Sequence, residues 1–184
     1  MTEKQVVLVD KDDRQIGVMG KLAAHQGKGT LHRAISVLLY RIRNGETEIL
    51  LQKRGKEKPL WPLFWTNTIC THPRDGETYV DCALRRLIEE MGIFFKKEDL
   101  NFVFRLKYHT QYDEEFSEYE LDSVFVGQWD EDVSVDHNEV DSYLWMEIGR
   151  LIQDLHQSPG KYTPWFLTIM EHPRTKTMFN KKTI

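Results

Sequence analysis

The sequence predicts one α+β or α/β domain, and three observations support this prediction. The chain has 184 residues, a length that suits a single domain with a full hydrophobic core. Its composition, 40% hydrophobic and 29% charged residues, is typical of a globular protein. Strand-like and helix-like segments alternate along the chain without a repeat or a low-complexity linker. We therefore expect residues 1–184 to form one domain.

Eight segments are predicted to be strands, because they are rich in β-branched and aromatic residues and are bounded by turn residues. They span 5–9, 15–19, 32–43, 48–53, 65–72, 101–108, 118–129 and 139–145. The strongest turn signal is Asn44-Gly45, which predicts a hairpin between the third and fourth strands. Pro73 is expected to end the fifth.

The clearest helix is predicted over 78–91. Thr78 is a suitable N-cap and Gly92 a suitable end. Helical spacing predicts a buried stripe of Leu84, Leu87, Ile88 and Met91. The opposite face is predicted to carry the charged residues Asp81, Arg85, Arg86, Glu89 and Glu90. Two more helices are expected, one over 148–156 and a final one that starts at Thr163-Pro164.

Bulk properties exclude several classes of protein. The longest apolar runs, such as 34–40, are too short to span a bilayer, and the N-terminus lacks the pattern of a signal peptide. We therefore expect a cytoplasmic protein with no membrane partner, in which Cys70 and Cys82 are free thiols. The net charge of −4 gives no support to a nucleic-acid partner.

Two short patterns are candidates for chemistry. In a strand, residues two apart face the same side, so Cys70 and His72 point one way, and so do Glu118 and Glu120. Taken alone, the first pattern is a small buried cysteine beside a surface histidine, and the second is a solvated acidic face. A divalent-cation site is the sharper interpretation of two carboxylates that face together.

A third pattern lies on the predicted helix. From Glu77 the sequence runs seven residues and then reads Arg85-Arg86-Leu87-Ile88-Glu89-Glu90-Met91-Gly92-Ile93. This resembles the Nudix box, which is Gly, five residues, Glu, seven residues, then Arg-Glu-apolar-X-Glu-Glu-X-Gly-apolar. Thr71 stands where the box begins with Gly, and Arg86 replaces its second Glu. In Nudix pyrophosphatases, carboxylates on this helix bind metals that activate water, so the arginine favours diphosphate binding without cleavage.

Over about 6–173 the chain also resembles the metal-dependent isopentenyl-diphosphate isomerases of the Nudix superfamily. The segments that carry this resemblance are Lys21-Leu-Ala-Ala-His25, Leu31-His32-Arg33, Trp61 to Pro73, Glu118-Tyr119-Glu120 and Thr163-Pro164-Trp165. The resemblance implies an α+β fold with a mixed β-sheet sandwiched by helices. It also implies an enzyme of isoprenoid biosynthesis that interconverts isopentenyl diphosphate and dimethylallyl diphosphate through a carbocation.

The same resemblance implies a role for individual residues. The implied ligands of a Mn²⁺ or Zn²⁺ ion are His25, His32, His72, Glu118 and Glu120. Glu90 would help to hold a Mg²⁺ ion bound with the diphosphate. The implied diphosphate-binding cations are Lys21, Arg54, Lys58 and Arg86. The implied acid/base residues are Cys70, Glu120 and Tyr108, with Cys70 acting as a thiolate, and Trp165 would cover the isoprenyl group. The expected partner is an isoprenyl diphosphate, and the expected state is a monomer or weak dimer.

Two other functions stay open at this point. A Nudix pyrophosphohydrolase of nucleoside diphosphate derivatives would need the glutamate that Arg86 replaces. A non-catalytic sensor of a phosphorylated metabolite would need neither Cys70 nor Tyr108. The family commonly has Gly where this chain has Thr71, which would be strained if its backbone required a positive φ.

Overall fold

The computed structural model describes residues 4–179. Nine strands join in one mixed sheet. They are β1 (Gln5–Val9), β2 (Gln15–Gly20), β3 (His32–Arg43), β4 (Glu46–Arg54), β5 (Trp65–Thr66), β6 (Ile69–Thr71), β7 (Asn101–Gln111), β8 (Ser117–Gln128) and β9 (Val140–Glu147). The α-helices are α1 (Lys21–Ala24), α2 (Tyr79–Met91), α3 (Ile148–Gln157), α4 (Pro164–Glu171) and α5 (Pro173–Phe179).

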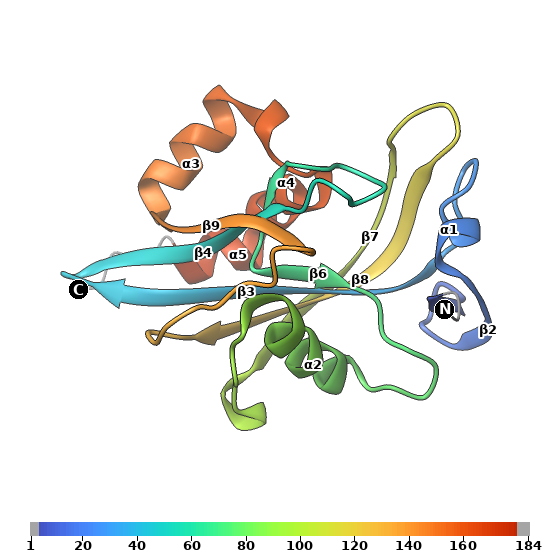
Figure 1. Cartoon of the computed structure of the whole chain (residues 1–184), viewed down its shortest axis with the longest axis horizontal. Coiled ribbons are helices and arrows are strands. Elements are labelled where there is room, and N and C mark those ends of the chain that lie inside the picture. The colour runs from blue at the N-terminus through green and yellow to red at the C-terminus, as the bar shows by residue number, and fades with distance from the viewer. Residues whose placement is uncertain (1–3, 180–184) are drawn as a thin grey trace.

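Strand β3 lies at the centre of the sheet. It pairs in parallel with β8 and antiparallel with β1, β4 and β6. Helix α2 covers one face of the sheet, and α3, α4 and α5 cover the other (Figure 1). Ile35, Val37 and Leu39 of β3 pack towards α2, whereas Leu38 packs towards α4. Because β3 is buried on both faces, most of it is apolar. The expected α+β fold, a mixed sheet between helices, is confirmed.

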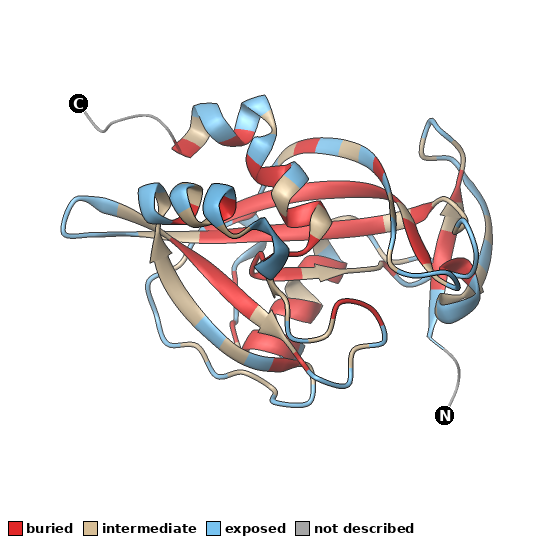
Figure 2. Cartoon of the chain, turned by 90° about the horizontal axis from the view of Figure 1, so that it is seen from above, coloured by how far each residue is buried: buried red, intermediate tan, exposed pale blue. Residues whose placement is uncertain are grey.

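Helix α2 begins and ends where the sequence predicts. The Thr78 side chain accepts a hydrogen bond from the Asp81 amide, and Gly92 closes the helix with a φ of 66°. The predicted buried stripe is partly wrong, because Ile88 is 43% exposed while Arg86 and Glu90 are buried. Figure 2 shows that the central strands of the sheet are largely buried, whereas the helices have exposed outer faces. Arg86 and Glu90 neutralise each other four residues apart, which allows both charges to turn inward beside the sheet.

The predicted strand over 65–72 is divided into β5 and β6. The polar side chains between them bond to neighbouring backbone instead of continuing the ladder. Thr68 Oγ1 donates to the carbonyl of Leu50 and accepts from the amide of Leu39, both at 2.8 Å. Asn67 Nδ2 donates to the carbonyl of Val37 at 3.3 Å. This break turns the chain so that β6 runs beside β3.

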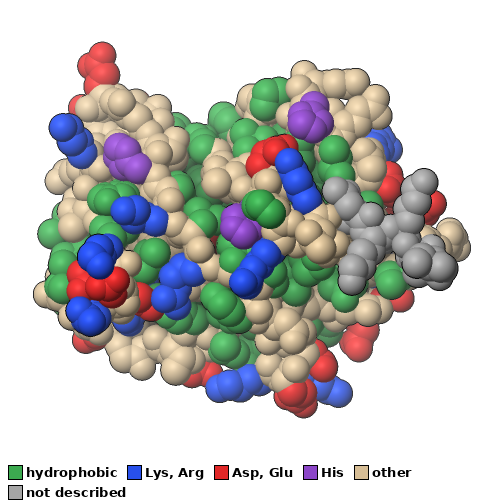
Figure 3. Space-filling view, turned by 180° about the vertical axis from the view of Figure 1, so that it is seen from behind, with side chains coloured by type: hydrophobic (Ala, Val, Ile, Leu, Met, Phe, Trp, Pro, Cys, Tyr) green, Lys and Arg blue, Asp and Glu red, His purple; other side chains and the backbone are tan. Residues whose placement is uncertain are grey.

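Two further differences concern the helices. α1 was not predicted, and α4 is not the final helix, because α5 follows it after a break at His172. Within residues 4–179, no helix is both long enough and apolar enough to cross a membrane. From behind, the molecule shows Lys and Arg side chains interspersed with acidic and apolar ones rather than a continuous basic surface (Figure 3).

Candidate active site

A cavity of about 750 Å³ opens beside the N-terminal end of β3. Its lining brings together many of the residues that the sequence singled out. These are Lys21, His25, Arg54, Lys58, Cys70, His72, Arg86, Glu118, Glu120 and Trp165. They come from separate parts of the chain, so the fold and not local sequence creates the site.

Three histidines and one glutamate converge at the inner end of the cavity. His25 ends α1, His32 begins β3, His72 follows β6, and Glu120 lies in β8 opposite His32. One ligand atom of each lies within 4.8 Å of the others. His25 Nδ1 and His32 Nδ1 are each 2.7 Å from a backbone carbonyl, that of Lys21 and that of Thr30. These Nδ1 atoms therefore carry the hydrogens, and the Nε2 lone pairs face inward.

The inward-facing atoms form a set that suits a divalent cation. The Nε2 atoms of His25, His32 and His72 lie 3.7, 3.4 and 2.8 Å from Glu120 Oε1. Burial and the charge of Lys21 hold the pKa of His72 well below its usual range. His32 Nε2 is buried and has no hydrogen-bond partner among the described residues. Lone pairs that face a carboxylate repel it unless a cation lies between them, and imidazole with carboxylate suits zinc or manganese.

Glu118 lies outside this four-residue group but is linked to it through Tyr108. The Tyr108 hydroxyl is 2.9 Å from Glu118 Oε2 and 2.5 Å from Glu120 Oε2. Burial and the nearby Glu120 raise the pKa of Glu118 well above its usual value. Burial acts to raise the pKa of Glu120 too, but the contacts with His72, His25 and His32 together outweigh burial, and the pKa falls well below the usual value. The Tyr108 hydroxyl therefore links the side chains of Glu118 and Glu120.

Cys70 lies in β6, opposite Ser36 of β3, and lines the cavity. Burial and the charge of Glu120 raise the pKa of its thiol well above the usual value. The structure therefore favours the thiol, whereas the resemblance implied a thiolate. Thr71, beside it, has the extended backbone of a strand residue and not a positive φ. The threonine is therefore accommodated without strain.

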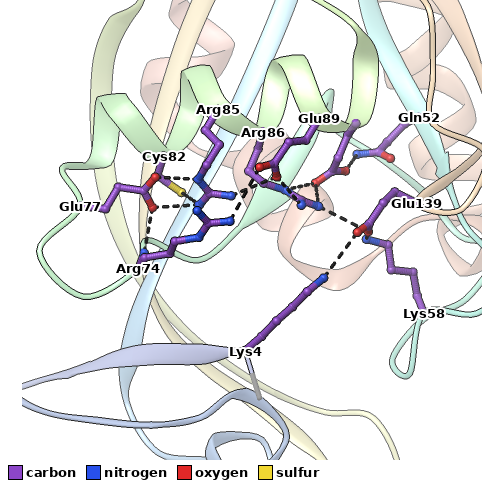
Figure 4. A network of polar contacts seen from close by, with 11 residues as sticks. Lys4, Gln52, Lys58, Arg74, Glu77, Cys82, Arg85, Arg86, Glu89 and Glu139 are labelled. Atoms are coloured by element: carbon purple, nitrogen blue, oxygen red, sulfur yellow. Dashed lines mark hydrogen bonds and ion pairs between the residues drawn. The ribbon is translucent and has the colours of Figure 1, made fainter. Parts of the chain in front are cut away.

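The four expected diphosphate-binding cations all line the cavity, but they are held differently. Burial and the charges of Lys58 and Arg54 lower the pKa of Lys21 to about 8. Lys58 and Arg86 are both paired with carboxylates, as Figure 4 shows. The site therefore combines anion-binding groups with counter-charges that are already in place.

Glu90 is 1% exposed and lies beneath Arg86 rather than in the cavity lining. Its Oε1 accepts from Arg86 Nε at 2.8 Å, and its Oε2 accepts from Gln52 Nε2 at 3.1 Å. Both oxygens thus have protein donors. A magnesium-binding role for Glu90 stays a prediction.

Trp165, the second residue of α4, forms an aromatic wall of the cavity and is 1% exposed. Its ring meets that of Trp61 edge to face, with centroids 5.5 Å apart. The indole Nε1 has no hydrogen-bond partner within residues 4–179. An indole ring at the cavity is an apolar surface that also attracts cations.

Sequence reasoning missed two acidic residues near the site. Asp122 is fully buried and accepts from Ser36 Oγ at 2.8 Å, and burial raises its pKa to about 8. The alternation that singled out Glu118 and Glu120 continues to Asp122, so that signal was available. Glu139, the residue before β9, contacts Lys58 and Arg86. No local sequence pattern predicts this contact, because it joins residues that are far apart in the sequence.

Comparison with known proteins shows which proteins this chain resembles. Residues 31–166 match the model of the family described as NUDIX domain. The isopentenyl-diphosphate Delta-isomerase of Pectobacterium atrosepticum is 40% identical over 162 residues, which cover 88% of this chain and 87% of that protein. The protein of the same name from Photobacterium profundum is 39% identical over 171 residues, 92% of this chain and 94% of its own.

Solved structures show the same fold at low sequence identity. A MutT protein from Methanosarcina mazei Go1 aligns with a TM-score of 0.61 at 18% identity, covering 82% of this chain and 96% of its own. A NUDIX hydrolase from Alicyclobacillus acidocaldarius aligns with a TM-score of 0.59 at 13% identity, covering 83% of this chain and 96% of its own. At these identities the likeness concerns the fold.

Proposed function

The chain belongs to the NUDIX domain family and, within it, to the isopentenyl-diphosphate Delta-isomerases, and on this premise we propose that its cavity interconverts isopentenyl diphosphate and dimethylallyl diphosphate. This reaction moves a double bond by adding a proton at one carbon and removing a proton from another. One observation carries the proposal: Cys70, Glu120, Trp165 and the four cations line the same cavity. A proton donor, a proton acceptor, an aromatic ring and an anion-binding end are what such a substrate requires.

The cluster at the inner end fits a divalent ion. His25, His32, His72 and Glu120 would hold Mn²⁺ or Zn²⁺, with Glu118 as the further ligand that the family resemblance implies. Such an ion supplies positive charge that orients and polarises the Glu120 carboxylate. The geometry supports this assignment, because the Nε2 atoms of the three histidines converge on one oxygen of the buried Glu120 carboxylate.

The proton transfers are assigned to Cys70 and Glu120. These residues lie on β6 and β8, which pair with β3 on opposite sides, so a substrate between them meets one on each side. One residue adds a proton at the terminal methylene carbon, and the other removes a proton from the carbon on the far side of the tertiary centre. In the reverse reaction they exchange roles. Tyr108 contacts Glu120 and keeps its carboxylate connected to Glu118.

The rest of the cavity holds the two ends of the substrate apart. Lys21, Arg54, Lys58 and Arg86 bind the diphosphate through charge-assisted hydrogen bonds. Trp165 faces the hydrocarbon and stabilises the positive charge that develops there, by up to about 2 kcal/mol in a dry site. Burial of the histidine cluster excludes water, which would otherwise quench a carbocation.

The test is an isomerase assay with isopentenyl diphosphate and magnesium. The wild type is expected to form dimethylallyl diphosphate, and Cys70→Ala and Glu120→Gln are each expected to lower kcat by more than about 10²-fold. Cys82→Ala is the matched control, because Cys82 is a free cysteine buried in α2 away from the cavity lining. Release of phosphate or pyrophosphate from nucleotides, with isopentenyl diphosphate left unchanged, would show a hydrolase instead.

A further inference from the structure

Glu139 lies in the cavity lining just before β9, and its carboxylate contacts cations from three segments of the chain (Figure 4). Its Oε2 accepts a hydrogen bond from Lys58 Nζ and lies 3.4 Å from a terminal nitrogen of Arg86. Its Oε1 lies 3.6 Å from Nζ of Lys4, an exposed residue. Lys58 and Arg86 are two of the cations assigned to the diphosphate. The Glu139 carboxylate therefore lies among the groups that meet this part of the substrate.

The backbone around Glu139 fixes this position. Its amide donates to the carbonyl of Asp136 at 2.9 Å, and its carbonyl accepts from the amide of Gly55 at 2.9 Å. A Cβ on Gly55 would lie 2.8 Å from the same carbonyl oxygen. The two loops that carry Lys58 and Glu139 are thus in direct backbone contact. The side chain of Glu139 is only 21% exposed. Its position in the site is therefore well defined.

The charges of this end of the cavity are already balanced in pairs. Arg86 contacts both Glu90 and Glu139, and Lys58 contacts Glu139. A bare diphosphate that reaches Lys58 and Arg86 meets the Glu139 carboxylate beside them, and like charges at this distance repel. A diphosphate that carries a divalent cation brings positive charge to the same place. The Glu139 carboxylate therefore repels the bare diphosphate and attracts the diphosphate that carries a divalent cation.

We propose that Glu139 makes the diphosphate end of the cavity select a diphosphate that carries a divalent cation over the same diphosphate without one. The inference rests on the proposed function, which places the diphosphate beside Lys58 and Arg86. Glu139 is a specificity-determining residue in this account. Its selectivity arises from repulsion of the wrong form as well as attraction of the right one.

The experiment measures binding of inorganic pyrophosphate by calorimetry, with and without added magnesium, to the purified protein with its resident metal retained. The readout is the dissociation constant measured without magnesium divided by the dissociation constant measured with magnesium. Glu139→Gln is expected to lower this ratio about tenfold relative to the wild type, chiefly because pyrophosphate without magnesium binds more tightly. The matched control is Glu89→Gln, because Glu89 contacts the same Arg86 at 2.9 Å but lies outside the cavity lining. It should keep the wild-type ratio.

A second variant tests the idea in the opposite direction. Lys58→Gln leaves Glu139 with less compensation, so the ratio should rise above that of the wild type. This variant covers the case in which Glu139→Gln does not fold. The proposal would be overturned if Glu139→Gln left the ratio of dissociation constants unchanged, or if it weakened pyrophosphate binding equally with and without magnesium. A lower ratio in Lys58→Gln would also overturn it.

The isomerase assay separates this inference from the proposed function. A protein that does not isomerise but shows the Glu139-dependent ratio supports the inference and refutes the activity. A protein that isomerises, with the same ratio in Glu139→Gln as in the wild type, supports the activity and refutes the inference.

Discussion

The guanidinium of Arg54 lies 5.1 Å from the ring centre of Trp165. Arg54 ends β4, whereas Trp165 is the second residue of α4, so this contact joins the sheet to a helix across the cavity. The same guanidinium donates from Nε to the carbonyl of Trp61 at 3.0 Å and from a terminal nitrogen to that of Leu60 at 2.9 Å. One side chain therefore links the anion-binding end of the cavity to its aromatic wall.

This arrangement predicts the effect of Arg54→Lys. The loop that Arg54 holds has left-handed backbone at Trp61, with φ 45°, and at Leu63, with φ 62°. Such conformations persist when surrounding contacts fix them. A lysine donates from one nitrogen and cannot hold two carbonyls in the same geometry. We expect the free energy of unfolding to fall by about 1–2 kcal/mol and KM for isopentenyl diphosphate to rise, as measured by urea denaturation and steady-state kinetics.

The control for that variant is Arg43→Lys, at the exposed end of β3. It should change neither quantity measurably. Equal behaviour of the two variants would mean that the two carbonyl contacts of Arg54 contribute nothing.

Gly55 offers a test of the contact between the two loops. Alanine there would place its Cβ 2.8 Å from the carbonyl oxygen of Glu139, and backbone on both sides leaves little room to adjust. We expect Gly55→Ala to destabilise the protein by about 1–3 kcal/mol, measured by denaturant unfolding. Gly160→Ala is the control, because its Cβ would meet no atom within 4 Å. If both variants are equally stable, the loops separate more easily than the structure indicates.

Glu139 predicts a specific dependence of stability on pH. Burial acts to raise its pKa, but Lys58, and then Arg86 and Lys4, outweigh burial and lower the pKa to about 2 from an ordinary value of 4.5. Because the folded-state value is the lower one, the carboxylate stabilises the protein above pH 4.5 and loses this contribution as the pH falls towards 2. The stability difference between wild type and Glu139→Gln should therefore be largest near pH 6 and shrink by pH 3.

Denaturant unfolding at a series of pH values measures this difference. Glu57→Gln is the control, because Glu57 is an exposed residue in the lining of the same cavity. Its difference from wild type should stay flat over the same range. A flat profile for Glu139→Gln as well would contradict the assignment of its ion pairs.

Much of the fold could be predicted because the periodicity of each segment matches its element. β3 has the predicted bounds, and α2 follows its predicted cap at Thr78. Periodicity failed at Ile88, where an apolar residue is exposed while Arg86 and Glu90 are buried as a pair. Apolar spacing treats each residue alone, and mutual neutralisation of two charges is outside its scope.

The candidate site also contains residues that local patterns predict and residues that they do not. Strand alternation placed Glu118 beside Glu120, whereas the meeting of His25, His32 and His72 followed only from the family resemblance. That meeting depends on the parallel register of β3 with β8, which opposes His32 and Glu120. Glu139 was missed because its contacts cross the fold without any local pattern.

The histidine cluster leads to the last prediction, which concerns metal content. His25 Nε2 and His72 Nε2 lie 3.7 and 2.8 Å from the same Glu120 oxygen, and each supplies one inward-facing ligand atom. Loss of one ligand from a four-residue set weakens binding of Zn²⁺ or Mn²⁺ strongly. We expect His25→Ala and His72→Ala each to lose at least about tenfold in metal affinity, measured by metal analysis after dialysis against a chelator.

The same ion should stabilise the wild-type fold, because a ligand that binds the folded state alone raises its stability. Removing it should lower Tm in the wild type and leave the Tm of His72→Ala nearly unchanged, since that variant has little metal to lose. His156→Ala, at an exposed position in α3, is the control and should behave like the wild type in both measurements. The site would be refuted if wild-type protein held no divalent ion under these conditions. His32 Nε2 would then stay buried beside Glu120 without a compensating cation.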